Sequence, residues 1–170
     1  MSGPQVRIVH LSAEALGALA AGDLEAASAA SPVPLTPWLV SDEAIGTWRY
    51  RVRQVADTPA DLGWVTGVIW DDEREVVVGK AGFHGAPDAS GMVEVGYAVD
   101  PAERRRGYAR AALLAMLDRA RAEPSVRTFR ATVSPTNTAS LGLIAQLPFA
   151  EVGEQWDDED GLETIYELPV

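Results

Sequence analysis

Residues 92–114 constrain the fold more than any other part of the chain, because they combine the patterns of a strand, a loop and a helix. They read MVEVGYAVDPAERRRGYARAALL. Apolar residues alternate up to Val99, and Pro101 then lacks the N–H that a further ladder hydrogen bond requires. The alanine-rich stretch after Gly107 has the period of a helix. The pattern predicts a strand that leaves its sheet through a short loop and enters a helix.

Three consecutive arginines, Arg104–Arg106, stand beside the predicted helix start. The helix dipole opposes positive charge there, because its N-terminal end is itself partly positive. Gly107 and Ala109 are small, and unpaired backbone N–H groups at a helix start form a site for anions. The loop is therefore predicted to hold a phosphate-like group. The alternative is a solvated loop without a ligand.

The charge of the whole chain has the opposite sign. Fourteen Lys and Arg residues against 25 Asp and Glu residues give a net charge of −11. Such a field repels phosphate backbones and argues against a nucleic-acid partner. The absence of cysteine excludes disulfides, thiolate metal sites and a cysteine nucleophile. Neither a signal-peptide pattern nor an apolar run of about 20 residues occurs. We therefore expect a soluble, cytoplasmic protein without a membrane partner.

Hydrophobic periodicity along the chain predicts one α/β domain with a mixed sheet. The predicted elements are, in order, a strand at 6–10, helices at 12–20, 23–30 and 42–55, strands at 64–71, 75–85 and 92–100, a helix at 109–120, a strand at 126–134, a helix at 137–147 and a hairpin over 149–169. The turn sequences DDER and APDASG separate the three central strands, which predicts an antiparallel meander.

Four motifs occur together within residues 79–154: GKAGF at 79–83, VEVGYAVDP at 93–101, RRRGYA at 104–109 and SPTNTASLGLIAQLPFAEVGE at 134–154. RRRGYA fits the Arg/Gln-x-x-Gly-x-Gly/Ala signature of the GNAT superfamily of N-acetyltransferases. The chain resembles this superfamily over roughly residues 76–168. The combined motifs are most similar to the branch that contains the ribosomal-protein N-terminal acetyltransferases.

The resemblance implies a fold. It is a single GNAT-like α/β domain over residues 1–170, with a mixed, mostly antiparallel sheet and helices on both faces. The sheet is expected to splay after its fourth strand, beyond Val99. Residues 5–60 would form a helical region on the acceptor side, and residues 64–168 would form the sheet and the cofactor-binding core.

The resemblance also implies acetyl-CoA as co-substrate and no metal. Backbone groups of Tyr97, Ala98 and Val99 would bind the pantetheine arm. Asn137 would contact the pantetheine region as well; the alternative is that it caps the helix that follows. The pyrophosphate would be held by Arg104, Arg105, Arg106, Gly107, Tyr108, Ala109 and Arg110.

Glu94 is the candidate base, because it lies in the middle of an otherwise apolar strand, where the family often has a carboxylate. The alternative is an ordinary solvent-facing residue on an alternating strand. A backbone N–H near Val99 would stabilise the oxyanion. Ile144 stands where many relatives have a tyrosine that acts as the acid, so Ser140 or a water is the candidate acid here.

These residues predict direct transfer of an acetyl group to a primary amine in a ternary complex. The negative charge of the chain favours a small cationic amine or a protein N-terminus as acceptor. The alternative is an inactive CoA-binding sensor or partner-binding module, in keeping with Ile144. Homodimers are common in the resembled family. The two histidines, His10 and His84, are isolated and predict no metal site.

Overall fold

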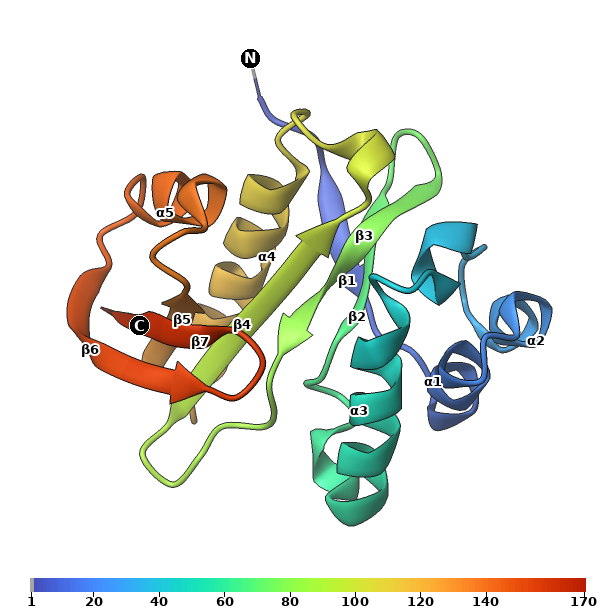
Figure 1. The fold of residues 1–170 in the computed structure, drawn as a ribbon, viewed down its shortest axis with the longest axis horizontal. Coiled ribbons are helices and arrows are strands. Elements are labelled where there is room, and N and C mark those ends of the chain that lie inside the picture. Colours follow the sequence, from blue (N-terminus) through green and yellow to red (C-terminus); the bar gives the residue numbers. More distant parts are fainter. Residues whose placement is uncertain (1) are drawn as a thin grey trace. The chain divides into compact units, whose positions relative to one another are not determined.

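The computed structural model describes residues 2–170 and contains five α-helices and seven strands within them (Figure 1). The helices are α1 (Ala13–Ala20), α2 (Leu24–Ala30), α3 (Ile45–Asp57), α4 (Tyr108–Ala122) and α5 (Thr138–Ile144). The strands are β1 (Val6–Val9), β2 (Gly67–Asp71), β3 (Val76–Phe83), β4 (Met92–Val99), β5 (Thr128–Val133), β6 (Ala150–Asp157) and β7 (Gly161–Pro169). Short 3₁₀ helices cover Pro37–Val40 (η1), Pro59–Asp61 (η2) and Pro101–Glu103 (η3). No helix in residues 2–170 is long and apolar enough to cross a bilayer.

The strands are hydrogen-bonded in the order β1-β2-β3-β4-β5-β7-β6. The pairs β1–β2, β2–β3, β5–β7 and β6–β7 are antiparallel, whereas β4 and β5 are parallel. The predicted α/β class with a mixed, mostly antiparallel sheet is therefore confirmed.

Two compact units make up the chain, and both β4 and α4 contribute residues to each of them. The first unit comprises the residues up to Ala86 together with Gly96–Met116, and the second comprises Pro87–Val95 and Leu117–Val170. The predicted splay of the sheet after Val99 concerns the relation between these units and stays a prediction.

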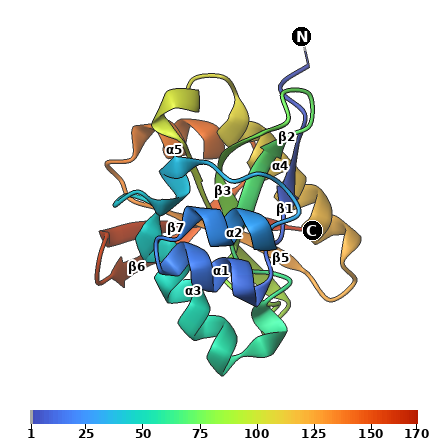
Figure 2. The same ribbon diagram turned by 90° about the vertical axis from the view of Figure 1, so that its right-hand side faces the viewer.

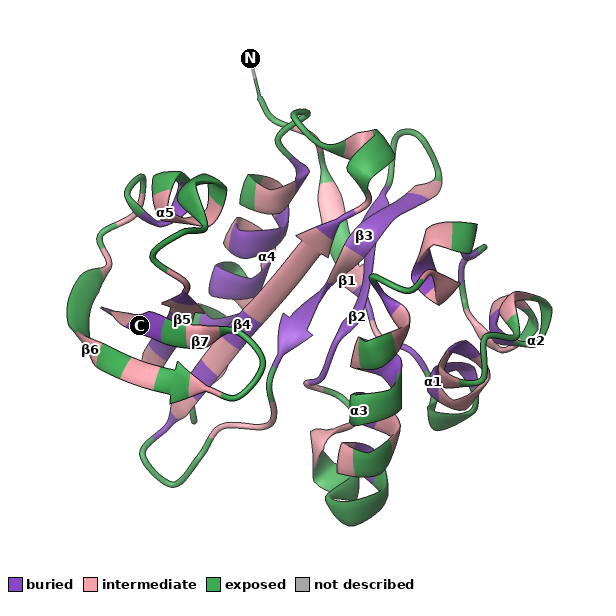
Figure 3. Cartoon of the chain, viewed as in Figure 1, coloured by how far each residue is buried: buried purple, intermediate pink, exposed green. Residues whose placement is uncertain are grey.

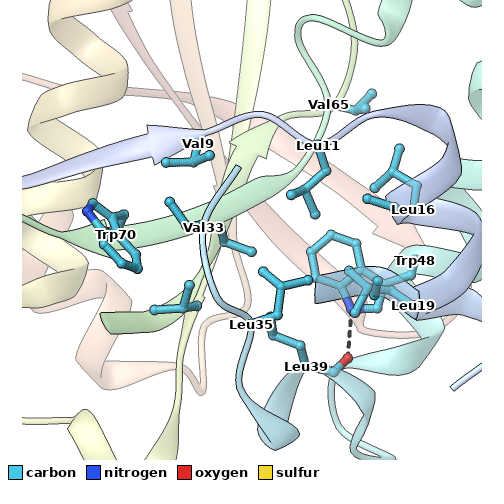
Figure 4. Packing of buried hydrophobic residues seen from close by; sticks show 14 of the residues in the cluster. Val9, Leu11, Leu16, Leu19, Val33, Leu35, Leu39, Trp48, Val65 and Trp70 are labelled. Carbon is cyan, nitrogen blue, oxygen red and sulfur yellow. Dashed lines mark hydrogen bonds between the residues drawn. The ribbon is translucent and has the colours of Figure 1, made fainter. Parts of the chain in front are cut away.

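The core of the first unit lies around Trp48 of α3, whose side chain is fully buried. Its indole N–H donates a 2.7 Å hydrogen bond to the carbonyl of Leu39 (Figure 4). Leu16 of α1 and Val9 of β1 belong to the same cluster, so the helical layer of α1, α2 and α3 (Figure 2) is joined to the sheet by apolar contacts. Burial of this kind is the main stabilising contribution to a fold.

The helix starts of the first unit follow local hydrogen bonds. Ser12 caps α1, because its hydroxyl accepts a 3.1 Å hydrogen bond from the N–H of Ala15. The third helix begins at Ile45 and not at residue 42. The carbonyl of Ser41 accepts from the N–H groups of both Ala44 and Ile45, which makes residues 41–44 a turn that precedes α3.

The second unit contains the predicted C-terminal hairpin. β6 and β7 are joined by a turn in which a carboxylate oxygen of Asp157 accepts 2.8 Å hydrogen bonds from the N–H groups of Glu159 and Asp160. Residues Met92–Glu94 of β4 pair with Thr128–Arg130 of β5. Figure 3 shows that β6 is largely exposed, whereas β2 in the first unit is buried along its whole length.

Candidate active site

The loop between β4 and α4 has left-handed backbone geometry at two positions, which are separated by Arg106. Arg105 has φ = 63° and Gly107 has φ = 85°. The left-handed region is disfavoured for a residue with a β-carbon by about 1–2 kcal/mol, so surrounding contacts must hold Arg105 there. Left-handed residues in such loops turn successive N–H groups toward one point and form an anion-binding nest. The geometry fits the predicted anion site.

Gly107 stands at the point where the loop becomes a helix. Its carbonyl accepts a 3.0 Å hydrogen bond from the N–H of Ala111, the first bond of α4. A β-carbon at Gly107 would lie 3.3 Å from Cδ of Pro4 and would also be strained by the positive φ. Within residues 2–170 the structure records no acceptor for the N–H groups of Arg105, Arg106 and Gly107. These donors are available to a ligand.

A buried hydrogen-bond network fixes the start of α4. The hydroxyl of Tyr108 donates a 2.5 Å hydrogen bond to the carboxylate of Asp71, at the end of β2, and both side chains are buried. Burial and this hydrogen bond raise the pKa of Tyr108, so its hydroxyl stays protonated. The guanidinium of Arg74 donates to the Tyr108 hydroxyl at 2.9 Å and to Glu103 at 2.7 Å. The side chain of Tyr108 is therefore committed to this network, and a ligand contact through its backbone N–H stays a prediction.

Burial and hydrogen bonding have opposite effects on the pKa of Asp71. Burial of its carboxylate opposes charge, but hydrogen bonds from Tyr108 and from the N–H groups of Arg74 and Glu73 outweigh that effect and lower the pKa. Sequence reasoning missed Asp71 and Arg74. The available signal was that Asp71 is an acidic residue at the end of an apolar strand. Its partner Tyr108 could not be identified from sequence, because the two residues are 37 positions apart.

The three loop arginines differ in their partners. Arg104 donates to the carbonyl of Val99 at 3.1 Å and to the carboxylate of Glu43 at 2.9 Å. Arg106 forms an ion pair with Glu103 at 3.1 Å. Arg105 is exposed, and the structure records no partner for it within residues 2–170. Its side chain is thus the one of the three that is uncommitted.

The segment predicted to bind pantetheine, Tyr97–Val99, lies in the first unit with the loop. β3 packs closely on it: a β-carbon at Gly79 would lie only 2.4 Å from the carbonyl oxygen of Ala98. The structure thus brings the two predicted parts of the cofactor site, strand and loop, together in one compact unit.

The remaining candidates, Glu94, Asn137 and Ser140, belong to the second unit. Glu94 accepts a 2.7 Å hydrogen bond from the hydroxyl of Thr132 on β5 and is half-buried. The side chain of Asn137 caps α5 by accepting from the N–H of Ser140 at 3.1 Å, so the capping alternative is confirmed. Ile144 is buried in the same unit. The catalytic and cofactor roles of Glu94, Asn137 and Ser140 stay predictions.

Lys80 of β3 and Arg51 of α3 are two cations for which the sequence predicted no role, and they lie between α3 and β3. Lys80 is the only lysine of the chain. Its ammonium donates a 2.6 Å hydrogen bond to the hydroxyl of Thr47. Burial, together with the nearby charge of Arg51, lowers the pKa of Lys80 to about 8. Arg51 is itself buried, with 7% of its surface exposed. The signal available from sequence was the single lysine in a chain with 14 basic residues.

The histidines form no metal centre with their neighbours. Nε2 of His84 lies 3.0 Å from the position that a β-carbon on Gly96 would occupy. Across residues 2–170, no group of three or more His, Asp or Glu side chains is arranged to hold a metal ion.

Comparison with known proteins decides the family. Residues 6–150 match the family model described as an acetyltransferase (GNAT) domain. The chain belongs to the GNAT acetyltransferase family. This GNAT protein is 31% identical over 114 residues to the uncharacterized N-acetyltransferase YjdG of Bacillus subtilis, and the match spans 66% of each chain. The predicted acyltransferase family is confirmed.

Solved structures agree with the fold of this GNAT protein. A spermidine N-acetyltransferase from Vibrio cholerae is similar with a TM-score of 0.66 and 12% identity, over 97% of this chain and 94% of that chain. The ribosomal-protein alpha-N-acetyltransferase RimL, solved in complex with coenzyme A, is similar with a TM-score of 0.64 and 15% identity, over 98% and 94%. At these identities the similarity concerns the fold.

Proposed function

We propose that the protein transfers an acetyl group from acetyl-CoA to a primary amine by direct transfer in a ternary complex. The observation that carries this function is the loop of a GNAT-family fold in which Arg105 and Gly107 adopt positive φ and leave N–H groups without acceptors. A pyrophosphate in this nest accepts from these N–H groups and supplies a negative charge beside Arg105, the loop arginine without a recorded partner in residues 2–170.

Tyr97–Val99 hold the pantetheine arm through backbone hydrogen bonds, as if the arm were an added strand. Arg105 adds charge at the pyrophosphate, while Arg104 and Arg106 hold the loop through Glu43 and Glu103. The complex of RimL with coenzyme A supports the choice of co-substrate.

The reaction needs a base for the amine, a donor for the oxyanion and a proton for the thiolate. The amine nitrogen attacks the thioester carbonyl, its proton passes to Glu94, and the C–S bond breaks to release the thiolate of CoA. The hydrogen bond from Thr132 orients the Glu94 carboxylate. A backbone N–H near Val99 stabilises the oxyanion, and Ser140 or a water protonates the thiolate.

The chain's net charge of −11 supports a cationic acceptor, and relatives of the same fold include enzymes named for spermidine and for ribosomal protein. Net charge is a weak guide here, because an acceptor responds to the charges that line its own site.

CoA binding tests the cofactor site. Gly107→Glu places a strained, negatively charged side chain in the nest, and we expect CoA affinity measured by calorimetry to fall at least 100-fold. Gly46→Glu is the matched control, because Gly46 is exposed in the first turn of α3 and a β-carbon there meets nothing within 4 Å. Melting curves of both variants show whether they fold. Unchanged affinity in a folded Gly107→Glu variant contradicts the placement.

Turnover tests the reaction. Acetyl-CoA is incubated with a panel of primary amines, and release of free CoA thiol is recorded. We expect Glu94→Gln to reduce turnover about 100-fold or more without weakening CoA binding. Glu154→Gln, on the exposed edge of the same unit, is the control. Tight CoA binding with no turnover on any amine would favour the CoA-binding sensor, in keeping with the buried Ile144.

A further inference from the structure

Arg51 and Lys80 form a cationic cluster between α3 and β3 of the first unit. Thr47, which accepts the hydrogen bond from Lys80, lies one helical turn before Arg51 on α3. Residues four apart share one face of a helix. The two cations therefore lie on the same side of α3, and the charge of Arg51 acts on Lys80.

Neither cation is neutralised by a carboxylate. Within residues 2–170, Arg51 and Lys80 form no ion pair. The guanidinium of Arg51 donates to the hydroxyl of Thr66 at 3.1 Å, to the side-chain oxygen of Gln54 at 2.6 Å and to the carbonyl of His84 at 3.4 Å. All three acceptors are uncharged. Its charge also lies over the ring of Tyr50, 5.1 Å from the centroid.

The two carboxylates that act electrostatically on the cluster, Glu43 and Asp61, have other partners. Glu43, which acts electrostatically on Lys80, accepts from the guanidinium of Arg104 at 2.9 Å. Asp61, which acts on Arg51, accepts from Gln54 at 2.8 Å and from the N–H of Ala86 at 2.9 Å. Nη2 of Arg51 and two of the three N–H groups of Lys80 have no recorded acceptor within residues 2–170, so they are available to an anion that comes from outside the chain.

The cluster is costly for folding, which argues that it serves a ligand. A buried charge without a counter-charge destabilises a fold, and its pKa shifts toward the neutral form. Such a shift is what burial and Arg51 produce at Lys80. Strained or uncompensated groups of this kind are typical of functional sites.

The cluster lies beside the strand segment that is proposed to hold pantetheine. Gly79, next to Lys80 on β3, approaches the carbonyl of Ala98 closely, and His84 lies over Gly96. The backbone carbonyl of His84 also accepts the hydrogen bond from Arg51. These contacts all belong to the first unit.

We propose that Arg51 and Lys80 bind a carboxylate of the acceptor, so that the substrate carries both a primary amine and a carboxylate, as an amino acid does. The inference rests on the proposed function for its location and specifies the acceptor class. A single carboxylate offsets part of the positive charge of the cluster and accepts one hydrogen bond from each cation. A polyamine, in contrast, is repelled by it.

Binding is tested first, without turnover. Because Lys80 is the only lysine, protein labelled with ¹³C-lysine gives one lysine side-chain signal whose titration reports this site alone. At constant ionic strength, 50 mM acetate or 4-aminobutyrate should raise the pKa of Lys80, whereas acetamide and 1,4-diaminobutane should not. No difference between acetate and acetamide overturns the inference. A larger rise with inorganic phosphate than with acetate assigns the site to phosphate and overturns it as well.

Turnover is tested with matched pairs of acceptors, each amino acid being compared with its carboxamide and its decarboxylated amine. We expect kcat/KM at least tenfold higher for the carboxylate-bearing member. Lys80→Met should raise KM for that member at least tenfold, with little effect on kcat or on its partners, and Lys80→Arg should restore it. Arg53→Met, which removes an exposed cation of α3, is the control.

The two proposals fail differently. If acetate shifts the titration of Lys80 but no amine is acetylated, the anion site stands and the transferase function fails. If diamines are acetylated as well as amino acids and Lys80→Met changes neither, the function stands and the acceptor class is wrong.

Discussion

The hydroxyl of Tyr108, the first residue of α4, donates a 2.5 Å hydrogen bond to the buried carboxylate of Asp71 at the end of β2. The nest of N–H groups at Arg105–Gly107 immediately precedes this tyrosine. The hydrogen bond thus fixes the start of the helix against the sheet, and Arg74 connects the same hydroxyl to Glu103 in the loop. Rigid support of this kind keeps ligand donors in position.

Tyr108→Phe should destabilise the protein, because the buried Asp71 carboxylate loses a donor. We expect the free energy of unfolding at pH 7 to fall by about 1–3 kcal/mol. The pKa of Asp71 is lowered in the folded state, so its stabilisation is present above its unfolded pKa and lost as the pH falls through the folded one. Denaturant unfolding should therefore show a difference between variant and wild type that shrinks below about pH 4.

Tyr50→Phe is the control for that comparison, since Tyr50 is 57% exposed and the loss of its hydroxyl should change stability little. An equal loss in both variants would contradict the special role of the buried pair.

Arg105 and Arg106 should contribute unequally to CoA affinity. Arg105→Ala removes an uncommitted cation and should weaken binding about tenfold, whereas Arg106→Ala removes one already paired with Glu103 and should cost less. Calorimetry at low and high salt should show a smaller salt dependence for Arg105→Ala than for wild type. Arg105→Lys keeps both the positive charge and a β-carbon at this left-handed position, so it should retain most of the affinity for CoA. Equal losses for the two alanine variants would contradict this assignment.

The local part of the site was predictable from sequence, because it depends on neighbours in the chain. Alternation up to Val99, Pro101 and the small Gly107 predict the strand, the loop and the helix start. The left-handed Arg105 was not predictable, since arginine has no preference for that conformation and the contacts that hold it come from elsewhere.

Contacts between distant segments were missed for a related reason. Asp71 and Tyr108 are 37 positions apart, and Lys80 and Thr47 are 33 apart. Nothing in the pattern around an isolated aspartate or lysine states what will pack against it. The sequence marks Lys80 only as the single lysine, and its burial follows from the position of α3 over β3.

Asn137 should affect stability and CoA affinity separately. Asn137→Ala removes the cap of α5 and should lower the free energy of unfolding by about 1 kcal/mol, whereas Asn137→Ser retains a capping oxygen and should not. The resemblance to the family predicts a cofactor contact as well, so Asn137→Ser should lose severalfold in CoA affinity at unchanged stability. Full affinity in that variant would leave the cap as the only role of Asn137.

Lys80→Met should make the protein more stable at neutral pH while weakening its use of carboxylate acceptors. The pKa of Lys80 is lowered to about 8 from the ordinary 10.5, first by burial and then by Arg51. Charged Lys80 therefore destabilises the folded state fully below about pH 8, and the penalty disappears as the pH rises toward 10.5. Since one pKa unit corresponds to about 1.4 kcal/mol, the variant should gain on the order of 3 kcal/mol at pH 7.

Denaturant unfolding at pH 7 and near pH 10 checks this expectation, because the gain should be large at the first pH and small at the second. Other groups that titrate between pH 7 and pH 10 are the same in wild type and Lys80→Met, so their effect cancels in the difference between the two free energies of unfolding. Arg53→Met, which removes an exposed charge from α3, should show no such pH dependence. A gain that is equal at both pH values would mean that methionine merely packs better than lysine, and that the buried charge is not the cause.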